Sequence, residues 1–287
     1  MPQLARLVGT VVKLAEKVSD DPQDDPVQLG HGGYADRVYV GLLALREATS
    51  DTYAGTIGRV ESSPRIQSAL GLGGETAGPP AESTLCTAAS RLTAAFWRTM
   101  LAITTTLFSL SGVCAIDASG FDRSAASRRY EQRCGYTIRS LKTTLLVDVD
   151  SLAIIDVHCS TGKPHDTQIG WKVIKRNRDN PHLEVVLGDK GYDWAELRDF
   201  CRETGIRPLI KHREFTSLDK AHNARLDTQL YAQRSQVETV FSVLKRRFGD
   251  SVRARSWHGQ FREMLCRCVA YNVDRALNGQ NPTPSGV

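Results

Sequence analysis

The sequence predicts a mixed α/β protein in which an all-helical N-terminal part precedes a sheet flanked by helices. Two observations predict this division. Up to about residue 110, short stretches with the apolar spacing of helices alternate with turn-forming residues. After Gly112, segments rich in Val, Ile, Leu and Thr appear, with helical stretches between them. A chain of 287 residues has room for two modest domains, and we place them at 1–110 and 111–280.

The first domain consists of short helices separated by turns. The expected helices are 4–18, 34–48, 64–70 and 83–92, with a loop at 71–80 and a continuation, after a break, from 92 towards 107. Ser83 would cap the fourth helix, and the Asp- and Pro-rich segment 19–26 is a linker. Val38, Leu42 and Leu45 would share one face of the second helix.

Two roles fit these helices equally well. Helices of this length suit a helix-turn-helix, with 83–92 as the recognition helix carrying Arg91. A plain helical bundle that only orients the second domain has the same pattern.

The second domain alternates strands with helices. The expected strands are 113–117, 142–149, 152–159, 183–187 and 206–210. The expected helices are 166–176, 194–204, 230–248 and 260–277. Only Asp150 and Ser151 separate the second and third strands, which is short enough for a hairpin. The order βββαβαβα describes a mixed sheet flanked by helices and is that of the ribonuclease-H-like fold.

Composition argues against a membrane or secreted protein. The uncharged segment 100–116 is, at 17 residues, at the lower limit of a membrane span, and it includes several Thr and Ser. The N-terminus lacks the charged-then-apolar layout of a signal peptide. The seven cysteines are scattered, and the pair Cys266 and Cys268 lacks a second pair with which to bind zinc. We therefore expect a cytoplasmic, nucleoid-associated protein with reduced thiols and no membrane partner.

Positive charge gathers in the C-terminal third of the chain. The formal net charge is only +5, but 207–268 holds 13 Lys and Arg against 6 Asp and Glu. Phosphate binding needs clustered charge of this kind. A solvated basic face would explain the same skew, so the charge indicates a polyanion partner only together with other evidence.

Two aspartates stand where predicted strands end. Asp117 closes the strand 113–117, and Asp189 follows the strand 183–187 after Gly188. Ligands of open α/β sheets gather at the carboxyl ends of strands, and Gly188 and Gly191 permit a ligand to approach Asp189 closely. A turn residue or a helix cap is the alternative role for each aspartate.

A third carboxylate, Glu238, lies on the predicted helix 230–248. At ~100° per residue, Tyr231, Arg234 and Lys245 fall within about 40° of Glu238. The helix would thus present a carboxylate flanked by two cations and a phenol. An exposed helix with an Arg234–Glu238 pair fits this spacing equally well.

These four residues match a known pattern without a gap. Tyr231, Arg234, Glu238 and Lys245 form Y-(2)-R-(3)-E-(6)-K, which resembles the signature of a large group of bacterial and archaeal insertion-sequence transposases of the DDE type. The glutamate motif is the specific part of the resemblance.

The resemblance extends to the aspartates and covers roughly 34–277. The strand ending at Asp117 and the segment 188–193 are similar to the family's first and second aspartate motifs. The helices at 34–72 resemble its helical DNA-binding region. The short gap before Glu238 leaves no room for the large β-insertion that some relatives carry.

The resemblance implies a metal-dependent enzyme that binds the terminal inverted repeats of an insertion sequence and catalyses DNA strand cleavage and strand transfer. Asp117, Asp189 and Glu238 would be the catalytic residues and would hold two Mg²⁺ ions, for which Mn²⁺ can substitute. Asp117 would bridge both ions, with Asp189 on one and Glu238 on the other.

The implied partner is double-stranded DNA, at the element ends and at the target, with a homodimer in the DNA complex. Tyr231, Arg234 and Lys245 would contact the DNA, the two cations at phosphates. Further phosphate contacts, for which surface charge is an equal explanation, are Lys190, Arg246, Arg247, Arg253 and Arg255. Asp166 is expected to cap the helix that it begins.

Two other functions fit the same motifs. A nuclease on this fold would hydrolyse DNA or RNA without strand transfer, and products with joined strands would separate it from a transposase. A non-catalytic DNA-binding protein would use only the N-terminal helices, and it would tolerate Asp117→Ala.

Overall fold

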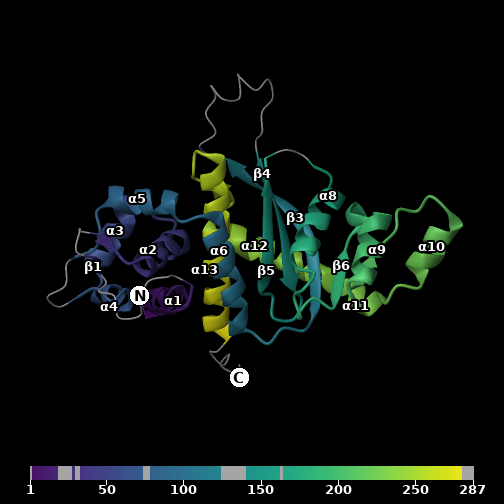
Figure 1. The fold of residues 1–287 in the computed structure, drawn as a ribbon, viewed down its shortest axis with the longest axis horizontal. Helices are drawn as coiled ribbons and strands as arrows, with labels where there is room; N and C mark the ends of the chain where they lie inside the picture. The colour runs from purple at the N-terminus through teal and green to yellow at the C-terminus, as the bar shows by residue number, and fades with distance from the viewer. Residues whose placement is uncertain are drawn as a thin grey trace, which may run out of the picture. The chain divides into compact units, whose positions relative to one another are not determined.

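A computed structural model describes residues 2–18, 28–29, 33–73, 78–123, 140–161 and 164–279 (Figure 1). The chain divides into two compact units. The first comprises Met1–Leu107, Arg247–Gly249 and Ala254–Val287, and the second comprises Phe108–Arg246 and Asp250–Arg253. The predicted linker 19–26 and the middle of the predicted loop 71–80 lie outside the described residues.

The first unit is built from helices with one short two-stranded sheet. Its helices are α1 (Pro2–Ala15), α2 (Asp36–Thr49), α3 (Tyr53–Glu61), α4 (Pro64–Ala69), α5 (Glu82–Arg91), α6 (Ala94–Thr104), the 3-10 turn η1 (Thr105–Leu107) and α13 (Trp257–Gly279). Strands β1 (Gln28–Leu29) and β2 (Gly33–Tyr34) pair antiparallel. The sequence predicts that the C-terminal helix belongs to the second domain. In the structure this helix, α13, packs against α1, α2 and α6.

Helix α2 is buried on all sides. Residues 37–47 are all buried, because α1, α3, α5 and α13 pack around it. Gly41 makes the approach of α1 possible, since a Cβ there would lie 2.8 Å from Cγ2 of Val12 and 2.9 Å from Cδ2 of Leu70. The expected single apolar face, with Val38 and Leu42 on it, is therefore too narrow a description.

A buried arginine joins α13 to α2. Arg267 donates from Nε to Glu47 at 2.9 Å and from Nη2 to Glu263 at 2.5 Å, and all three side chains are buried. Burying charges without partners is costly, so the two carboxylates and the guanidinium depend on one another. Cys266 and Cys268 are buried free thiols of the same helix, as expected.

Three details of this unit differ from the sequence prediction. Tyr34 lies in β2, and the second helix begins at Asp36. Helix α3 was not predicted. Ser83 is not a cap, because α5 begins at Glu82 with Ala81 before it and without a side-chain cap. The expected break after Leu92 is present, where the Thr93 hydroxyl caps α6.

The second unit contains the main sheet. Its strands are β3 (Val113–Arg123), β4 (Ser140–Asp148), β5 (Ile154–Ser160), β6 (Val185–Gly188), β7 (Arg207–Ile210) and β8 (Ser251–Val252). The strand order is β5-β4-β3-β6-β7, with β8 beside the end of β3. β3, β4 and β5 are antiparallel neighbours, whereas β6 and β7 run parallel to β3.

Helices and 3-10 turns follow the strands. They are α8 (Asp166–Arg176), η2 (Lys190–Tyr192), α9 (Ala195–Glu203), α10 (Ser217–Ala224), α11 (Thr228–Ala232), η3 (Gln233–Ser235) and α12 (Gln236–Phe248). No helix in the described part of the chain is long and apolar enough to cross a membrane.

The two faces of β3 have different neighbours, because successive side chains of a strand point to opposite faces. Cys114 and Ile116 belong to a hydrophobic cluster with residues of α8 and α9. Ser119 and Phe121 lie on the other face, where they contact α12. Asp117 has the same parity as Ser119 and faces α12 as well.

Several predictions for this unit are confirmed and others are wrong. The predicted helix 166–176 is α8, and β4 and β5 form the predicted hairpin. Strand β3 runs six residues beyond Asp117, because β4 pairs with it as far as Asp122. The predicted helix 230–248 is divided into α11, η3 and α12, and α10 was not predicted.

Asp166 does not cap α8. His165 occupies the N-cap position, and Asp166 is the first helical residue. The Asp166 carboxylate pairs instead with Nζ of Lys142 at 2.7 Å, which joins the start of α8 to β4.

Candidate active site

Asp117 and Asp189 occupy equivalent positions on neighbouring parallel strands. β3 pairs with β6 as far as Ala115 opposite Leu187. Each residue of β6 in this ladder pairs with the residue of β3 that lies 72 positions earlier. The backbone is still extended two positions further on, so Asp189 lies beside Asp117. Neighbouring strands are about 4.8 Å apart, so the two carboxylates stand at the same level of the sheet. Asp117 therefore lies two residues beyond the last β3–β6 pair, and within β3 rather than at its end.

A glycine holds Asp189 in place. Asp189 caps η2, and its Oδ1 accepts a hydrogen bond of 2.8 Å from the N–H of Gly191. A Cβ on residue 191 would lie 2.8 Å from that same Oδ1, which is too close for any side chain. Only glycine can hold the carboxylate in this way.

Burial and neighbouring carboxylates raise the pKa of Asp117. Burial makes the largest contribution, and the N–H of Ala118, which donates to Oδ1 at 2.8 Å, opposes it. Asp189 and Glu238 raise the pKa further by repulsion, whereas Arg234 lowers it. The aspartate thus lies within electrostatic range of both other predicted carboxylates.

Arg234 connects two of the three predicted acids. Its Nη1 lies 3.5 Å from Oδ2 of Asp117, and its Nη2 lies 3.3 Å from Oε1 of Glu238. The second contact is the i,i+4 pair that the spacing allowed, and the first reaches a strand far away in sequence. One guanidinium therefore neutralises a carboxylate on β3 and another on α12.

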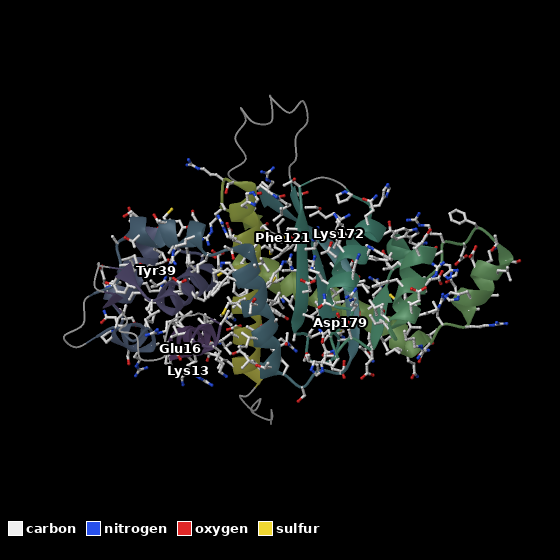
Figure 2. All side chains as sticks on the ribbon, viewed as in Figure 1. Lys13, Glu16, Tyr39, Phe121, Lys172 and Asp179 are labelled. Carbon is white, nitrogen blue, oxygen red and sulfur yellow. The ribbon has the colours of Figure 1, made fainter. Side chains whose placement is uncertain are left out.

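Lys245 lies against the same face of β3, where it contacts Ser119, two residues after Asp117. Its Nζ donates to Oγ of Ser119 at 2.7 Å and stands 5.4 Å from the ring centre of Phe121, the residue labelled in Figure 2. The Phe121 ring in turn packs against Phe241 of α12, with 6.4 Å between ring centroids. This packing fixes the register between α12 and β3 and so positions Arg234 beside Asp117.

Tyr231 completes the polar group on the helical segment. Burial raises the pKa of Tyr231, Arg234 opposes this, and both Asp189 and Asp117 raise it further. Nζ of Lys211 stands 4.7 Å above the phenol ring. The other five predicted site residues thus interact directly or electrostatically with Asp117 or its strand.

The three acids do not form a ready-made metal cage. Within the described ranges, no group of three or more His, Cys, Asp or Glu side chains is arranged to hold a metal ion. The Glu238 side chain is 60% exposed and points to Arg234. The structure brings Asp117 and Asp189 together and leaves Glu238 at the edge of the group.

The matching family model is the transposase DDE domain, which covers residues 109–273. The chain belongs to this family. It is a DDE transposase, an enzyme that acts in DNA transposition. No curated protein matches the sequence. A solved structure, the cryo-EM structure of piggyBac transposase synaptic complex with hairpin DNA, aligns over 98% of this chain and 77% of its own at 11% identity, with a TM-score of 0.46.

The donor set of the transposase suits the divalent metal ions that this family uses. Asp117 and Asp189 offer hard carboxylate oxygens, which Mg²⁺ and similar cations prefer. The repulsion between them raises the pKa of Asp117, and a cation between them would remove it. The pair therefore fits a divalent ion even before Glu238 joins.

One residue near the acids of the transposase, Tyr192, was not singled out by the sequence. Tyr192 is 1% exposed, and a Cβ on Gly170 would lie 2.7 Å from its ring. Burial first, and then Asp166, Asp117 and Asp189, raise the pKa of Tyr192 well above its usual value. Tyr192 thus belongs to the hydrophobic cluster of Cys114 and Ile116 and lies within electrostatic range of the carboxylates. Its place in the segment 188–193 was visible, but no periodicity indicated its burial.

The remaining predicted cations of the transposase are spread over its surface. Lys190, Arg246, Arg247 and Arg255 are exposed, and Arg253 is half-buried. Arg247 pairs with Asp274 within the first unit at 2.5 Å. Of these five cations, Lys190 is the one that lies close to the acids, because it directly follows Asp189 in the chain.

Proposed function

We propose that this transposase binds the terminal inverted repeats of an insertion sequence in the cytoplasm and performs metal-dependent strand cleavage followed by strand transfer. The observation that carries the proposal is the β3–β6 register, which sets Asp117 beside Asp189, together with the Arg234 bridge from Asp117 to Glu238. The partners are double-stranded DNA at the element ends and at the target. Because two ends must be cut together, the DNA complex contains a homodimer.

The catalytic unit is assigned to the ribonuclease-H-like fold. The support is the strand order β5-β4-β3-β6-β7, in which three antiparallel strands are followed by two strands parallel to the first. Helices α8 and α9 supply the crossovers between the later strands, as the order βββαβαβα requires.

Asp117, Asp189 and Glu238 hold two divalent ions, with Mg²⁺ as the natural choice and Mn²⁺ as a substitute. Such ions activate a nucleophilic oxygen and stabilise the leaving oxygen of a phosphodiester. Asp117 would be the ligand shared by both ions, because it lies within electrostatic range of both Asp189 and Glu238. Glu238 would join by leaving Arg234, through a change of rotamer of its exposed side chain.

Arg234 changes partner during this assembly. In the metal-free protein its guanidinium neutralises Asp117 and Glu238. With both carboxylates engaged by cations, the guanidinium would be free to hold a phosphate, which its fork suits. Lys245 is held by Ser119 at the same face and serves as a second phosphate contact, with Tyr231 packing alongside the strand.

DNA recognition is assigned to the helices of residues 1–110. Arg91 pairs with Asp36 of α2, and its guanidinium lies 5.8 Å from the ring of Tyr39. An arginine engaged in this way is poorly suited to reading base edges. This favours a bundle in which α5 supports other DNA-contacting elements over α5 as the recognition helix.

The test is cleavage of a duplex that carries the inverted repeat flanking the coding region, with Mg²⁺ present. Asp117→Asn and Asp189→Asn are each expected to lower the cleavage rate by more than about 1000-fold, because a carboxylate ligand of the ions is lost. Asp179→Asn is the matched control, since Asp179 lies in the same unit with a side chain that is 87% exposed (Figure 2). Full activity of Asp117→Asn would contradict the proposal.

Strand transfer has its own readout. Pre-cut ends supplied with target DNA should give products with joined strands, and these should disappear in Asp189→Asn. Cleavage without joined products would identify a nuclease instead. Binding of the repeat without any cleavage by the wild-type protein would identify a non-catalytic DNA-binding protein.

A further inference from the structure

A short arm beyond β7 carries the two most exposed large apolar side chains of the described residues. Phe215 is 84% exposed and Leu218 is 79% exposed. They lie at the beginning of α10, in the segment 211–224, which we call the α10 arm. Exposed single apolar residues are common, but a Phe and a Leu three residues apart that are both largely exposed are not.

The arm has a fixed shape although no residue of α10 is buried. The Thr216 hydroxyl and the Asp219 carboxylate form a complete capping box at the start of the helix. Asp219 also lies 3.1 Å from Nδ1 of His212, whose ring stacks on that of His222 with 3.8 Å between centroids. Asn223 closes the base, because its side chain accepts from the N–H of His212 at 2.9 Å and donates to the His212 carbonyl at 3.1 Å.

The arm is attached directly to the loop that follows Asp189. The N–H of Arg213 donates to Asp193 at 2.7 Å, and its Nε donates to the carbonyl of Lys190 at 3.1 Å. An open pocket of about 380 Å³ lies at this junction, lined by Lys190, Gly191, Arg213 and Glu214. The Gly191 that lines this pocket is the same residue whose N–H holds Asp189.

The charge around the arm suits a polyanion. Along the exposed backbone of 211–225 the cations are Lys211, Arg213, Lys220 and Arg225, and the acids are Glu214 and Asp219. The Asp219 carboxylate is already engaged within the arm, in the capping box and with His212. The pocket itself offers two cations for a phosphate, Lys190 and Arg213, beside one acid, Glu214, with apolar side chains two and five residues beyond Arg213.

The exposed apolar area is too small for a protein partner and right for a nucleobase. One aromatic side chain buries about 150–250 Å², whereas a stable protein interface needs about 800 Å² from each side. A projecting Phe and Leu with flanking cations are typical of side chains that insert between or stack on bases. The combination points to a base attached to a bound phosphate.

We propose that Phe215 and Leu218 stack on an unpaired base at the DNA end that is being cut, while Lys190 and Arg213 hold the phosphate next to it in the pocket. This inference rests on the proposed function, because it places the unpaired base beside the strand that Asp189 acts on. The arm thereby keeps the end of the duplex open during cleavage.

The experiment compares two duplexes and four proteins. One duplex is fully paired at the element end, and the other carries mismatched terminal pairs. The proteins are the wild type, the double variant Phe215→Ala/Leu218→Ser, the conservative variant Phe215→Trp and the control Ala221→Ser, whose site is an exposed position on the same helix. A 2-aminopurine at the terminal position reports unstacking from its neighbours, with Ca²⁺ replacing Mg²⁺ so that DNA is bound but not cut.

The double variant is expected to cleave the paired duplex about 5- to 100-fold more slowly, as the loss of one stacked base predicts, and to cleave the mismatched duplex within about 2-fold of the wild type. The fluorescence rise of 2-aminopurine should be lost in the same variant and kept in Phe215→Trp and Ala221→Ser. Equal slowing on both duplexes, or no slowing on either, would overturn the inference.

Two further results are decisive. If the double variant changes the oligomeric state of the free protein in sedimentation, the surface binds a second copy and the inference is wrong. If the wild type cleaves neither duplex, the proposed function fails, and the fluorescence response alone then decides whether the arm binds an unpaired base.

Discussion

Asp148 shows how a single buried carboxylate can organise two turns. It ends β4 and is fully buried. Its Oδ2 accepts from the N–H and hydroxyl of Ser111 at 2.8 and 2.7 Å, and its Oδ1 accepts from the N–H and hydroxyl of Ser151 at 2.9 and 2.7 Å. Burial acts to raise the pKa of Asp148, but the hydrogen bonds from Ser151 and Ser111 outweigh it and lower the pKa.

This lowered pKa predicts a pH-dependent loss of stability. A carboxyl whose pKa is lower in the folded protein stabilises it above the ordinary pKa, and that contribution is lost as the pH falls through the folded value. Asp148→Asn should therefore lower the free energy of unfolding by about 1–3 kcal/mol at pH 7, since an amide cannot accept all four bonds. The difference from the wild type should shrink below about pH 4, near the ordinary pKa of an aspartate.

Urea unfolding at several pH values measures this, with Asp150→Asn as the control because Asp150 is exposed in the same hairpin. A difference that stays constant from pH 7 to pH 3 would mean that hydrogen bonding to the ionised form is not the cause.

At the scale of single residues, the sequence predicted the polar stripe of the helix but not its long-range partner. The pair Arg234–Glu238 follows from a spacing of four, and it is present. The contact of Arg234 with Asp117 joins residues 117 positions apart, and no local pattern encodes it. The same holds for Lys245 and Ser119, because Ser119 lay beyond the end of the predicted strand.

At the scale of elements, the sequence predicted those that bury an apolar face. It did not predict those that are held by hydrogen bonds or by pairing with a neighbouring strand. Helix α8 was predicted to the residue because its apolar spacing faces the sheet. Helix α10 buries nothing and depends on its capping box, so it has no periodicity to find. The second half of β3 contains Ser119, Gly120 and Asp122, which disfavour strands, and it is extended because β4 pairs with it.

The pairing of β3 with β6 predicts a cation-dependent stability of the second unit. Asp117 and Asp189 repel each other where the ladder ends, so an ion bound between them stabilises only the folded state. At about a hundredfold excess over its Kd, the ion contributes about 2.7 kcal/mol, which corresponds to a rise in Tm of roughly 5–10 °C.

Differential scanning fluorimetry in EDTA and in Mg²⁺ measures this rise. The wild type and the exposed-site control Asp179→Asn should respond, and Asp117→Asn and Asp189→Asn should not. A similar rise in all four proteins would point to a cation site elsewhere.

At the scale of the whole molecule, the order of the chain does not match the order of packing. The change in sequence pattern lies near residue 110, and the second unit begins at Phe108. A linear sequence reading cannot show that the chain later returns to the first unit, because the apolar spacing of 257–279 is the same whichever unit it covers. The buried Arg267 could have hinted at this, since a charge in an apolar helix needs a partner from elsewhere.

The return of α13 predicts that the N-terminal helices cannot fold without it. A fragment of residues 1–107 should be largely unfolded, because it lacks a helix with 14 buried residues. It also leaves Glu47 without Arg267, the partner that α13 supplies, so that only Arg46 pairs with this carboxylate. Joining 1–107 to 254–279 through a flexible Gly/Ser linker should restore a folded unit.

Far-ultraviolet circular dichroism and urea unfolding of the two fragments measure this. The joined fragment should unfold cooperatively, and Arg267→Ala within it should remove most of its stability, whereas Arg255→Ala, at an exposed position, should not. Cooperative unfolding of 1–107 alone would show that the N-terminal helices carry their own core. In that case α13 would only pack against a domain that is already folded. Arg46, which lies 2.6 Å from Glu47, would then be a sufficient partner for the buried carboxylate.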